Sequence, residues 1–592
     1  MKYFFISLLC VSVFISCKSN STDHTETKTT NLDSSFNVIS NRFINELWKI
    51  YPGWATGLGN HTYDTVLIIP DESSRKKEVL FSTNYLDTFS YFNPNDLNES
   101  NKTDKALIEN FLKSVQFNMN QFKSYEWNPS EYNPGGSVAD ILNNKKEKSE
   151  LKVQHAVLKL KQINAYYAAA KTNIKNPTKE HTELAIMQLK GTMDYFASSL
   201  NDSIKKSALD DSKKQDLLNQ VIVINKSIAD FVTYLDSILK NSKNFRDFRI
   251  GKELYAEKFK FDIQSAYTPN EIYNKAMQRK IALLKEMDSI SKKLWPKYFK
   301  TAAYPTDNKV AIKKLITEIS KTHVERQKFQ QEIERQIPIL TAFVQKKDLL
   351  YLDPKKPLVV RKEPEWMAGV AGASISSPGP YDKEGDTFYN VGSLAAYSNE
   401  DAESFLREYN KYILQILNIH EAIPGHYAQL VYSNQSPSMI KSIFGNGAMI
   451  EGWAVYTERM MLEEGWAKNT ELNGKVEEDE MWLMYCKWHM RVVCNTILDY
   501  SLHNLNMSKE EGLNLLMNEA FQEKAEAEGK WKRATLTQVQ LCSYFTGYSE
   551  IHDLRESLKQ KQGNQFQLKK FHERFLSFGS APVSEIKKLM KD

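Results

Sequence analysis

Residues 418–427 read Asn418-Ile419-His420-Glu421-Ala422-Ile423-Pro424-Gly425-His426-Tyr427, and this stretch decides how the whole chain is interpreted. Two histidines with a glutamate directly after the first are typical of catalytic metal sites. The usual helical form is H-E-x-x-H, with the histidines four residues apart, whereas His420 and His426 are six apart. On an unbroken helix this spacing turns the second ring about 120° away from the first. Spacing alone therefore counts against a shared metal ion.

Two residues between the histidines change this interpretation. Pro424 has no backbone N–H, and its ring clashes with the carbonyl group four residues earlier, which belongs to His420. Gly425 can adopt backbone conformations that other residues avoid. We therefore predict a local bulge in the helix that brings His426 back to the face of His420.

A second stretch, Glu451-Gly452-Trp453-Ala454-Val455-Tyr456-Thr457-Glu458, follows His426 on an amphipathic segment. Catalytic zinc sites take three protein ligands and keep one position for water. Glu451 and Glu458 are seven residues apart, so they share a face of the predicted helix. We expect Glu451 to bind the metal and Glu458 to orient a histidine from behind, although the sequence leaves open which glutamate is the ligand. Trp453 is expected in the core.

Supporting residues follow further along the chain. Asp499 and His503 are candidates for a pair behind the ligands or for positioning substrate, and the alternative is a pair on a surface helix. Tyr544 is a candidate donor of a hydrogen bond to the oxyanion of a hydrolytic reaction, and the alternative is a packed core tyrosine. For His489 and Arg491 we predict a structural role.

The N-terminus has the pattern of a bacterial lipoprotein signal peptide. An apolar run from Phe4 to Ser16, too short to span a bilayer, ends directly before Cys17. Cys10 is a poorer candidate because Leu9 precedes it. We predict a signal peptide at 1–16, lipidation of Cys17 and a polar, flexible tether at 17–34. The mature protein would then be anchored in the cell envelope, on the periplasmic side of the outer membrane. The alternative is a plain secretory signal with another cleavage point.

The rest of the chain has the composition of a globular protein. Hydrophobic residues make up 41% and charged residues 26% of it. The net charge of +5 is small for 592 residues and there is no dense basic tract, so we expect no nucleic-acid partner. Cys486, Cys494 and Cys542 lie in apolar helical stretches and are predicted to be buried thiols.

Helical periodicity dominates the body of the chain. It runs through residues 36–47, 103–123, 150–175, 178–205, 212–240, 269–293, 309–346, 401–432, 438–463, 475–507, 509–527, 535–560 and 566–590. Short strand patterns separated by turn residues occur at 357–360, 373–375 and 387–391. We predict a mainly α fold, with an N-terminal helical region at 35–265 and a catalytic helical region at 266–592 that contains a small β element at 356–392. The segment 387–391 is a candidate to pair with an extended peptide by strand addition.

The two key stretches, HEAIPGHYAQ and EGWAVYTE, resemble the bacterial family called domain of unknown function 885, whose members are often lipoproteins. The resemblance extends through Asp499-Tyr500-Ser501-Leu502-His503 and Gln540-Leu541-Cys542-Ser543-Tyr544-Phe545-Thr546-Gly547 to Arg555. It covers most of the mature chain and is strongest from about residue 355 onward. Ser501 stands where the family often has glycine.

This family is grouped with metallopeptidases, so the resemblance implies a peptidase-like helical fold with a deep cleft and a zinc site. EGWAVYTE is similar to the N-E-G-F-A-x-Y-x-E segment of gluzincin aminopeptidases, in which the first glutamate binds zinc and corresponds to Glu451. Dipeptidyl-peptidase III tolerates a motif lengthened by one residue, whereas this chain inserts two. Zinc ligands would be His420, His426 and Glu451, and Glu421 would be the general base.

We therefore expect a lipid-anchored zinc hydrolase that cleaves peptide bonds, with a peptide as substrate. Two alternatives stay open. One is a helical nutrient-binding lipoprotein of the outer membrane without catalysis, and the other is a zinc amidase or esterase that acts on a non-peptide substrate. A bound metal would separate the enzymes from the binding protein, which has no use for such a site.

Overall fold

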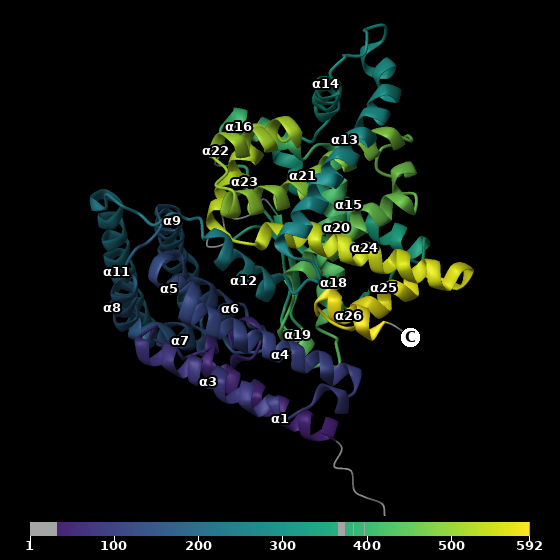
Figure 1. Ribbon diagram of the computed structural model, residues 1–592. Coiled ribbons are helices and arrows are strands. Elements are labelled where there is room, and N and C mark those ends of the chain that lie inside the picture. The colour runs from purple at the N-terminus through teal and green to yellow at the C-terminus, as the bar shows by residue number, and fades with distance from the viewer. Residues whose placement is uncertain (1–31, 365–372, 383, 396, 591–592) are drawn as a thin grey trace, which may run out of the picture.

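The computed structural model describes residues 32–364, 373–382, 384–395 and 397–590. Cys17, the predicted signal peptide and residues 17–31 of the predicted tether lie outside the described residues. Helices form most of the described chain, and three short strands form one sheet (Figure 1). The predicted mainly α fold with a small β element is confirmed.

The N-terminal helices, purple to blue in Figure 1, lie along one side of the molecule. They are α1 Leu32–Ile50, α2 Pro52–Gly57, α3 Glu72–Ser90, α4 Glu99–Phe117, α5 Ser124–Trp127, α6 Gly135–Asn143, α7 Ser149–Lys159, α8 Ile163–Asn173, α9 Lys179–Tyr195, α10 Asn201–Lys206 and α11 Asp211–Asn241. Residues 32–34, assigned to the tether from the sequence, form the first turn of α1. There the Asp33 carboxylate accepts hydrogen bonds from the Asn98 backbone and the Asn101 side chain.

The remaining helices include the three that contain the key stretches, α17, α18 and α20. They are α12 Gly251–Ile263, α13 Pro269–Phe299, α14 Asn308–Ser320, α15 Phe329–Lys346, α16 Asn399–Glu408, α17 Lys411–Glu421, α18 His426–Ser433, α19 Met439–Ile443, α20 Gly447–Glu463, α21 Glu478–Asn504, α22 Lys509–Asn514, α23 Lys524–Leu536, α24 Ser543–Gln562, α25 Leu568–Ser577 and α26 Val583–Leu589.

Five helices lie outside the periodic segments, namely α2, α3, α5, α6 and α12, of which α3 is the longest. The apolar face of α3 is confined to its second half, where Phe81, Tyr85 and Phe89 are buried at intervals of four residues. Its first half is strongly charged, so the periodic signal is weak over the whole helix. Tertiary packing of these three aromatic rings therefore stabilises a helix that the local sequence pattern does not predict.

One continuous hydrophobic core joins both ends of the chain. It contains Phe36 and Phe43 of α1 as well as Ile586 of α26. A second core, with buried residues from Tyr132 to Leu235, lies among α6 to α11. The predicted domain bounds at 35–265 and 266–592 are not tested by these cores and stay a prediction.

The small sheet consists of β1 Leu358–Lys362, β2 Ala373–Ser376 and β3 Thr387–Val391. The strand order is β1-β3-β2, with β1 parallel and β2 antiparallel to β3. The expectation that Thr387–Val391 accepts a peptide by strand addition is therefore wrong, because β3 is already paired along both edges. Instead, the buried Tyr389 hydroxyl donates a hydrogen bond of 2.8 Å to the side chain of Asn418 and so ties the sheet to α17.

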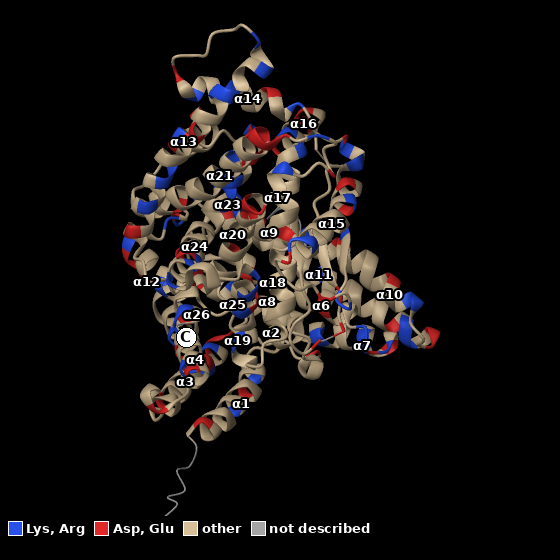
Figure 2. Ribbon diagram, turned by 90° about the vertical axis from the view of Figure 1, so that its right-hand side faces the viewer, with Lys and Arg blue, Asp and Glu red and all other residues tan. Residues whose placement is uncertain are grey.

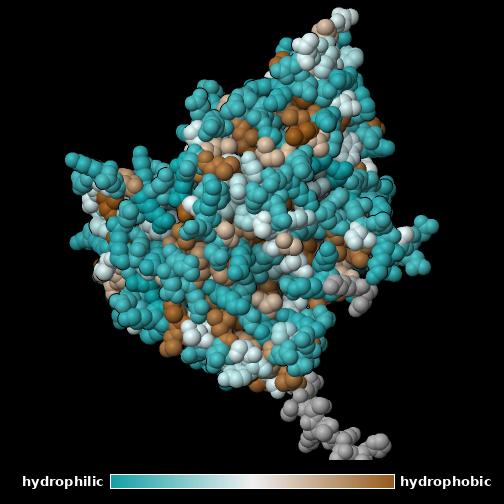
Figure 3. Space-filling view, viewed as in Figure 1, coloured by the Kyte–Doolittle hydropathy of each residue, from teal (hydrophilic) through white to brown (hydrophobic). Residues whose placement is uncertain are grey.

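The surface is polar and mixed in charge. Lysines and arginines are interspersed with acidic residues around the outside (Figure 2), and hydrophilic residues cover most of the face in Figure 3. None of the helices in the described ranges is both long and apolar enough for a membrane crossing. Cys486, Cys494 and Cys542 are buried and free, as predicted.

Candidate metal centre

A break between two helices brings the two histidines together. Helix α17 ends at Glu421 and α18 begins at His426, so the four residues between them form a tight turn. The two imidazole rings lie with their centroids 4.7 Å apart and nearly perpendicular. The predicted return of His426 to His420 is observed, but the predicted bulge in a continuous helix is wrong. The helix ends because the backbone N–H groups of Ala422 and Ile423 both bond to the Asn418 carbonyl.

Glycine is required at the end of this turn. A Cβ atom on Gly425 would lie 1.8 Å from the carbonyl oxygen of His420 and 2.4 Å from that of Ile419. The turn therefore folds back against the last turn of α17, where only a residue without a side chain fits. The Trp453 indole holds it there by donating a hydrogen bond of 2.9 Å to the Pro424 carbonyl. Trp453 is fully buried, as expected.

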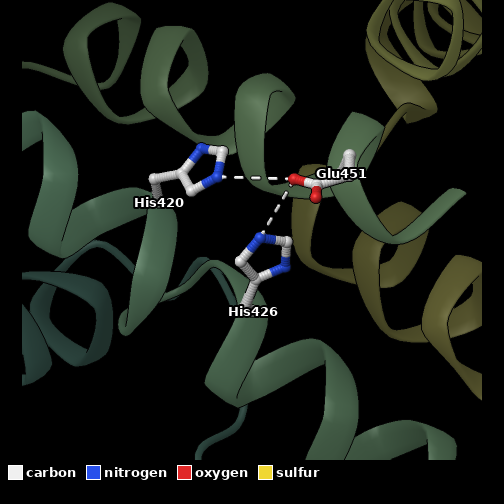
Figure 4. A group of neighbouring side chains, drawn as sticks. All are labelled: His420, His426 and Glu451. Atoms are coloured by element: carbon white, nitrogen blue, oxygen red, sulfur yellow. Dashed lines mark ion pairs between the residues drawn. The ribbon is translucent and has the colours of Figure 1, made fainter. Parts of the chain in front are cut away.

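Helix α20 brings a carboxylate to the two rings (Figure 4). Oε2 of Glu451 lies 3.7 Å from Nε2 of His420 and 3.3 Å from Nε2 of His426. A tetrahedral zinc ion with bonds of about 2.1 Å keeps neighbouring ligand atoms about 3.4 Å apart, so these separations fit such an ion. Glu451 Oε2 is also buried without a hydrogen-bond partner among the described residues, as a ligand atom would be.

Glu458 lies behind His420. Its Oε1 atom is 2.7 Å from Nδ1 of His420 and accepts a hydrogen bond of 2.9 Å from the Trp488 indole. Glu458 is fully buried, and its contact with Nδ1 leaves Nε2 of His420 directed at Glu451. The geometry thus groups Glu451 with the two histidines and gives Glu458 the orienting position.

The electrostatics of the group favour a cation at its centre. Burial alone would lower the pKa of His420, but the nearby carboxylates of Glu451 and Glu458 raise it to about 10. Burial opposes ionisation of Glu451, yet the two histidines hold the pKa of this carboxyl well below its usual value. A positive charge next to these two carboxylates is therefore favourable.

Tyr544 lies at the site because helices α20 and α24 cross closely. A Cβ atom on Gly547 would lie 1.7 Å from the Ala448 carbonyl oxygen, and one on Gly452 would lie 2.3 Å from the Gly547 carbonyl carbon. The backbones of α20 and α24 are therefore in direct contact one residue after Glu451. Consequently the Tyr544 ring lies almost parallel to the His420 ring, with centroids 6.4 Å apart. Burial raises the pKa of Tyr544, so its hydroxyl stays protonated at neutral pH.

Glu421 is the last residue of α17 and is buried. Asp499 and His503 are also buried, so the alternative of a surface helix pair is wrong. Asp499 accepts hydrogen bonds from the backbone N–H groups of Val539 and Leu541, and burial raises its pKa to about 7. His503 Nε2 lies 3.2 Å from the carbonyl oxygen of the nearby Thr537. The pair therefore holds the segment that leads into α24.

His489 and Arg491, for which a structural role was predicted, contact other side chains of the protein. His489 is fully buried between the rings of Tyr485 and Tyr548. Arg491 donates two hydrogen bonds, of 2.9 and 2.6 Å, to Oε1 of Glu526 on α23.

Sequence reasoning missed three residues close to the centre, namely Trp488, Lys530 and Arg533. Trp488 contacts Glu458, and Arg533 donates a hydrogen bond of 2.9 Å to the Tyr544 hydroxyl. Lys530 and Arg533 lie on a polar helix whose local pattern resembles any solvated surface helix. No signal in the sequence separates them from the many other lysines and arginines.

The chain is similar to two solved structures over nearly its whole length. One is a protein from Shewanella oneidensis that is described as a "putative lipoprotein of unknown function". It is 50% identical to this chain, with a TM-score of 0.81, and the match covers 94% of this chain and 100% of that chain. A "putative lipoprotein" from Colwellia psychrerythraea is 17% identical, with a TM-score of 0.74 and coverage of 94% and 98%. This second likeness shows the fold alone.

No curated protein matches the chain. The family described as "Bacterial protein of unknown function (DUF885)" matches residues 52–590. This range includes both helices of the histidine pair, the helix of Glu451 and the helix of Tyr544. The resemblance noted in the two key stretches is confirmed, whereas the relation to gluzincins stays a prediction. Because the match spans most of the sequence, the chain belongs to the DUF885 family.

Proposed function

We propose that this protein is a zinc-dependent hydrolase that cleaves peptide bonds. Its main support is the convergence of His420 Nε2, His426 Nε2 and Glu451 Oε2. Three protein ligands and an open side are typical of catalytic zinc sites, whereas structural sites use four. The Glu451 side chain is 19% exposed, while its Oε2 atom is buried beside the two histidines.

Each residue of the site has a distinct task in this proposal. A bound zinc ion would act as a Lewis acid that polarises a carbonyl group and lowers the pKa of a water molecule to about 7. Glu421, next to His420 in the chain, takes a proton from the attacking water and passes it to the leaving amine. Glu458 accepts a hydrogen bond from Nδ1 of His420, so that Nε2 would be the atom that holds the ion. Tyr544 donates a hydrogen bond from its hydroxyl group to the oxyanion of the substrate.

We further propose that a lipid on Cys17 anchors the protein in the cell envelope, on the periplasmic side of the outer membrane. The Ser16-Cys17 sequence supports this placement, and both structural neighbours are described as "putative lipoproteins". The substrate would then be a peptide in that compartment.

Metal analysis tests the proposal directly. After mild purification we expect about one zinc ion per chain, the number that a single three-ligand site holds. His426→Ala should lose the metal, whereas His323→Ala should keep it, because His323 pairs with Glu403 on a different surface. Digestion of a peptide library with the zinc-loaded protein then tests the reaction. If the protein contains no transition metal and takes none up, the nutrient-binding lipoprotein becomes the better explanation.

A further inference from the structure

Arg533 places a positive charge beside the metal centre without a carboxylate partner. Its NH2 group donates hydrogen bonds of 2.9 Å to the Tyr544 hydroxyl and to the Gln540 side chain, which are both neutral. Its Nε atom is buried and has no hydrogen-bond partner among the described residues. Among the described residues, no carboxylate forms an ion pair with Arg533. Arg533 is partly buried, and an arginine in such a position normally pairs with a carboxylate, so the missing partner suggests a ligand.

Lys530, one turn earlier on α23, adds to this excess of positive charge. It is only 4% exposed, and its Nζ atom lies 3.9 Å from Oε1 of Glu526. That oxygen already accepts two hydrogen bonds from Arg491. Glu526 is therefore already paired with Arg491, and Lys530 has only a longer contact with the same oxygen. Burial and the charge of Arg491 lower the pKa of Lys530 well below its usual value, and a ligand carboxylate would reverse this effect.

The position of Arg533 relates it to the substrate. Tyr544 separates Arg533 from the metal ligand His420, since its hydroxyl contacts the guanidinium and its ring lies parallel to the imidazole. If the scissile carbonyl group of a substrate lies at the metal centre, Arg533 would be within reach of groups one or two residues away along the substrate chain. The planar guanidinium matches a carboxylate through paired hydrogen bonds, which makes this group the best-suited ligand.

We propose that Arg533, assisted by Lys530, binds a carboxylate of the substrate next to the scissile bond. This inference rests on the proposed function and narrows its substrates to peptides with a carboxylate close to the bond that is cleaved. The terminal carboxylate lies one residue, about 3.8 Å of chain, beyond the last peptide bond. The site is therefore suited to removing C-terminal residues. An acidic side chain next to the scissile bond would offer Arg533 the same kind of carboxylate.

Three matched peptides test the inference. They are an N-acetylated tripeptide with a free C-terminus, its C-terminal amide, and the same amide with glutamate as the last residue. The wild-type protein should prefer the free acid to the plain amide by about 10- to 150-fold in kcat/KM, the range expected for charge-assisted hydrogen bonds. Comparison with the glutamate amide shows whether a terminal or a side-chain carboxylate is recognised.

Arg533→Gln should abolish the preference for the acid. Lys532→Gln, an exposed neighbour on the same helix, should leave it unchanged. Arg533→Lys keeps the charge and should keep part of the preference, which preserves the test if Arg533→Gln does not fold. If Arg533 only positions Tyr544, its loss will slow the acid and the amide equally, and the inference is then overturned.

A binding measurement separates this inference from the proposed function. Calorimetry on the full-length Glu421→Gln variant, with and without zinc, should show tighter binding of the free acid than of the amide. If no peptide is hydrolysed but binding is selective for the acid and depends on Arg533, the proposed function fails and the carboxylate site stands. Equal or undetectable binding of the acid and the amide overturns the carboxylate site, even if both peptides are hydrolysed.

Discussion

At the scale of single residues, the proposed mechanism gives Glu421 and its neighbour His420 different tasks: Glu421 would transfer protons and His420 would bind the metal. Glu421→Gln preserves the size of the side chain but removes the proton acceptor. We expect an unchanged zinc content and a fall in kcat of about 10²- to 10⁴-fold, the usual contribution of a general base. Metal analysis and steady-state kinetics on the same preparation check both parts. Near-normal turnover by a folded variant would place the base elsewhere, with Glu458 the next candidate.

Glu458 is predicted to act on the metal through His420. Glu458→Gln retains a hydrogen-bond acceptor for Nδ1 but loses the charge that makes Nε2 a better ligand. Such changes behind a metal ligand typically weaken binding by about 10- to 100-fold. Competition with a zinc chelator measures the affinity. Glu463→Gln, which alters a partly exposed glutamate paired with Arg459 and Arg555, should bind zinc normally. Equal affinities for both variants would argue against an orienting role.

At the scale of elements, the contact between α20 and α24 fixes the distance between Glu451 and Tyr544. Gly547→Ala adds a methyl group where the Ala448 carbonyl oxygen lies 1.7 Å away, so the helices must separate. We expect a loss of stability of about 1–3 kcal/mol, as for other overpacked positions, together with weaker zinc binding. Urea denaturation and zinc titration measure the two effects.

The control for this change is Gly529→Ala on α23. A Cβ atom there has no neighbour within 4 Å, and alanine favours an exposed helix over glycine by up to about 1 kcal/mol. Gly529→Ala should therefore be neutral or stabilising. If both variants behave alike, the close crossing does not hold the site together.

The break between α17 and α18 shows how far local sequence can predict an element. Pro424 and Gly425 predict that the histidine helix is distorted, but the structure has a break between two helices in place of the predicted bulge. They do not specify the form of the interruption, which depends on the Trp453 indole from α20 and on the space beside the His420 carbonyl. Similarly, the periodic segment 401–432 forms three helices, α16, α17 and α18, and the Asn410 side chain caps the start of α17.

At the scale of the whole molecule, the predicted anchor at Cys17 determines where the protein is located. Cys17→Ala should move the protein from the membrane fraction to the soluble fraction of the cell envelope, since no helix in the described ranges could replace the lipid as a membrane span. Cys10→Ala should leave the protein on the membrane. Fractionation followed by immunoblotting gives the result. Membrane association of the Cys17 variant would indicate another anchor.

The sequence by itself determined the properties that depend on residue type and short spacing. Helical periodicity predicted most helices, and the strand patterns predicted β1, β2 and β3. The identities of His420, Glu421 and His426 followed from their order in one short stretch. The burial of the three thiols followed from their apolar surroundings. These features are local, because a backbone preference or a burial pattern depends on residues within one or two turns.

Only the tertiary structure decided how distant segments meet. It directed Glu451 at the Nε2 atoms and Glu458 at Nδ1, although both glutamates share one helix face. It placed β3 between its two partners, buried Asp499 and His503 against the segment before α24, and brought Arg533 to Tyr544. The physical reason is that such contacts depend on side-chain packing and backbone approach between segments far apart in the chain. In this protein, the glycine contact between α20 and α24 is the clearest example.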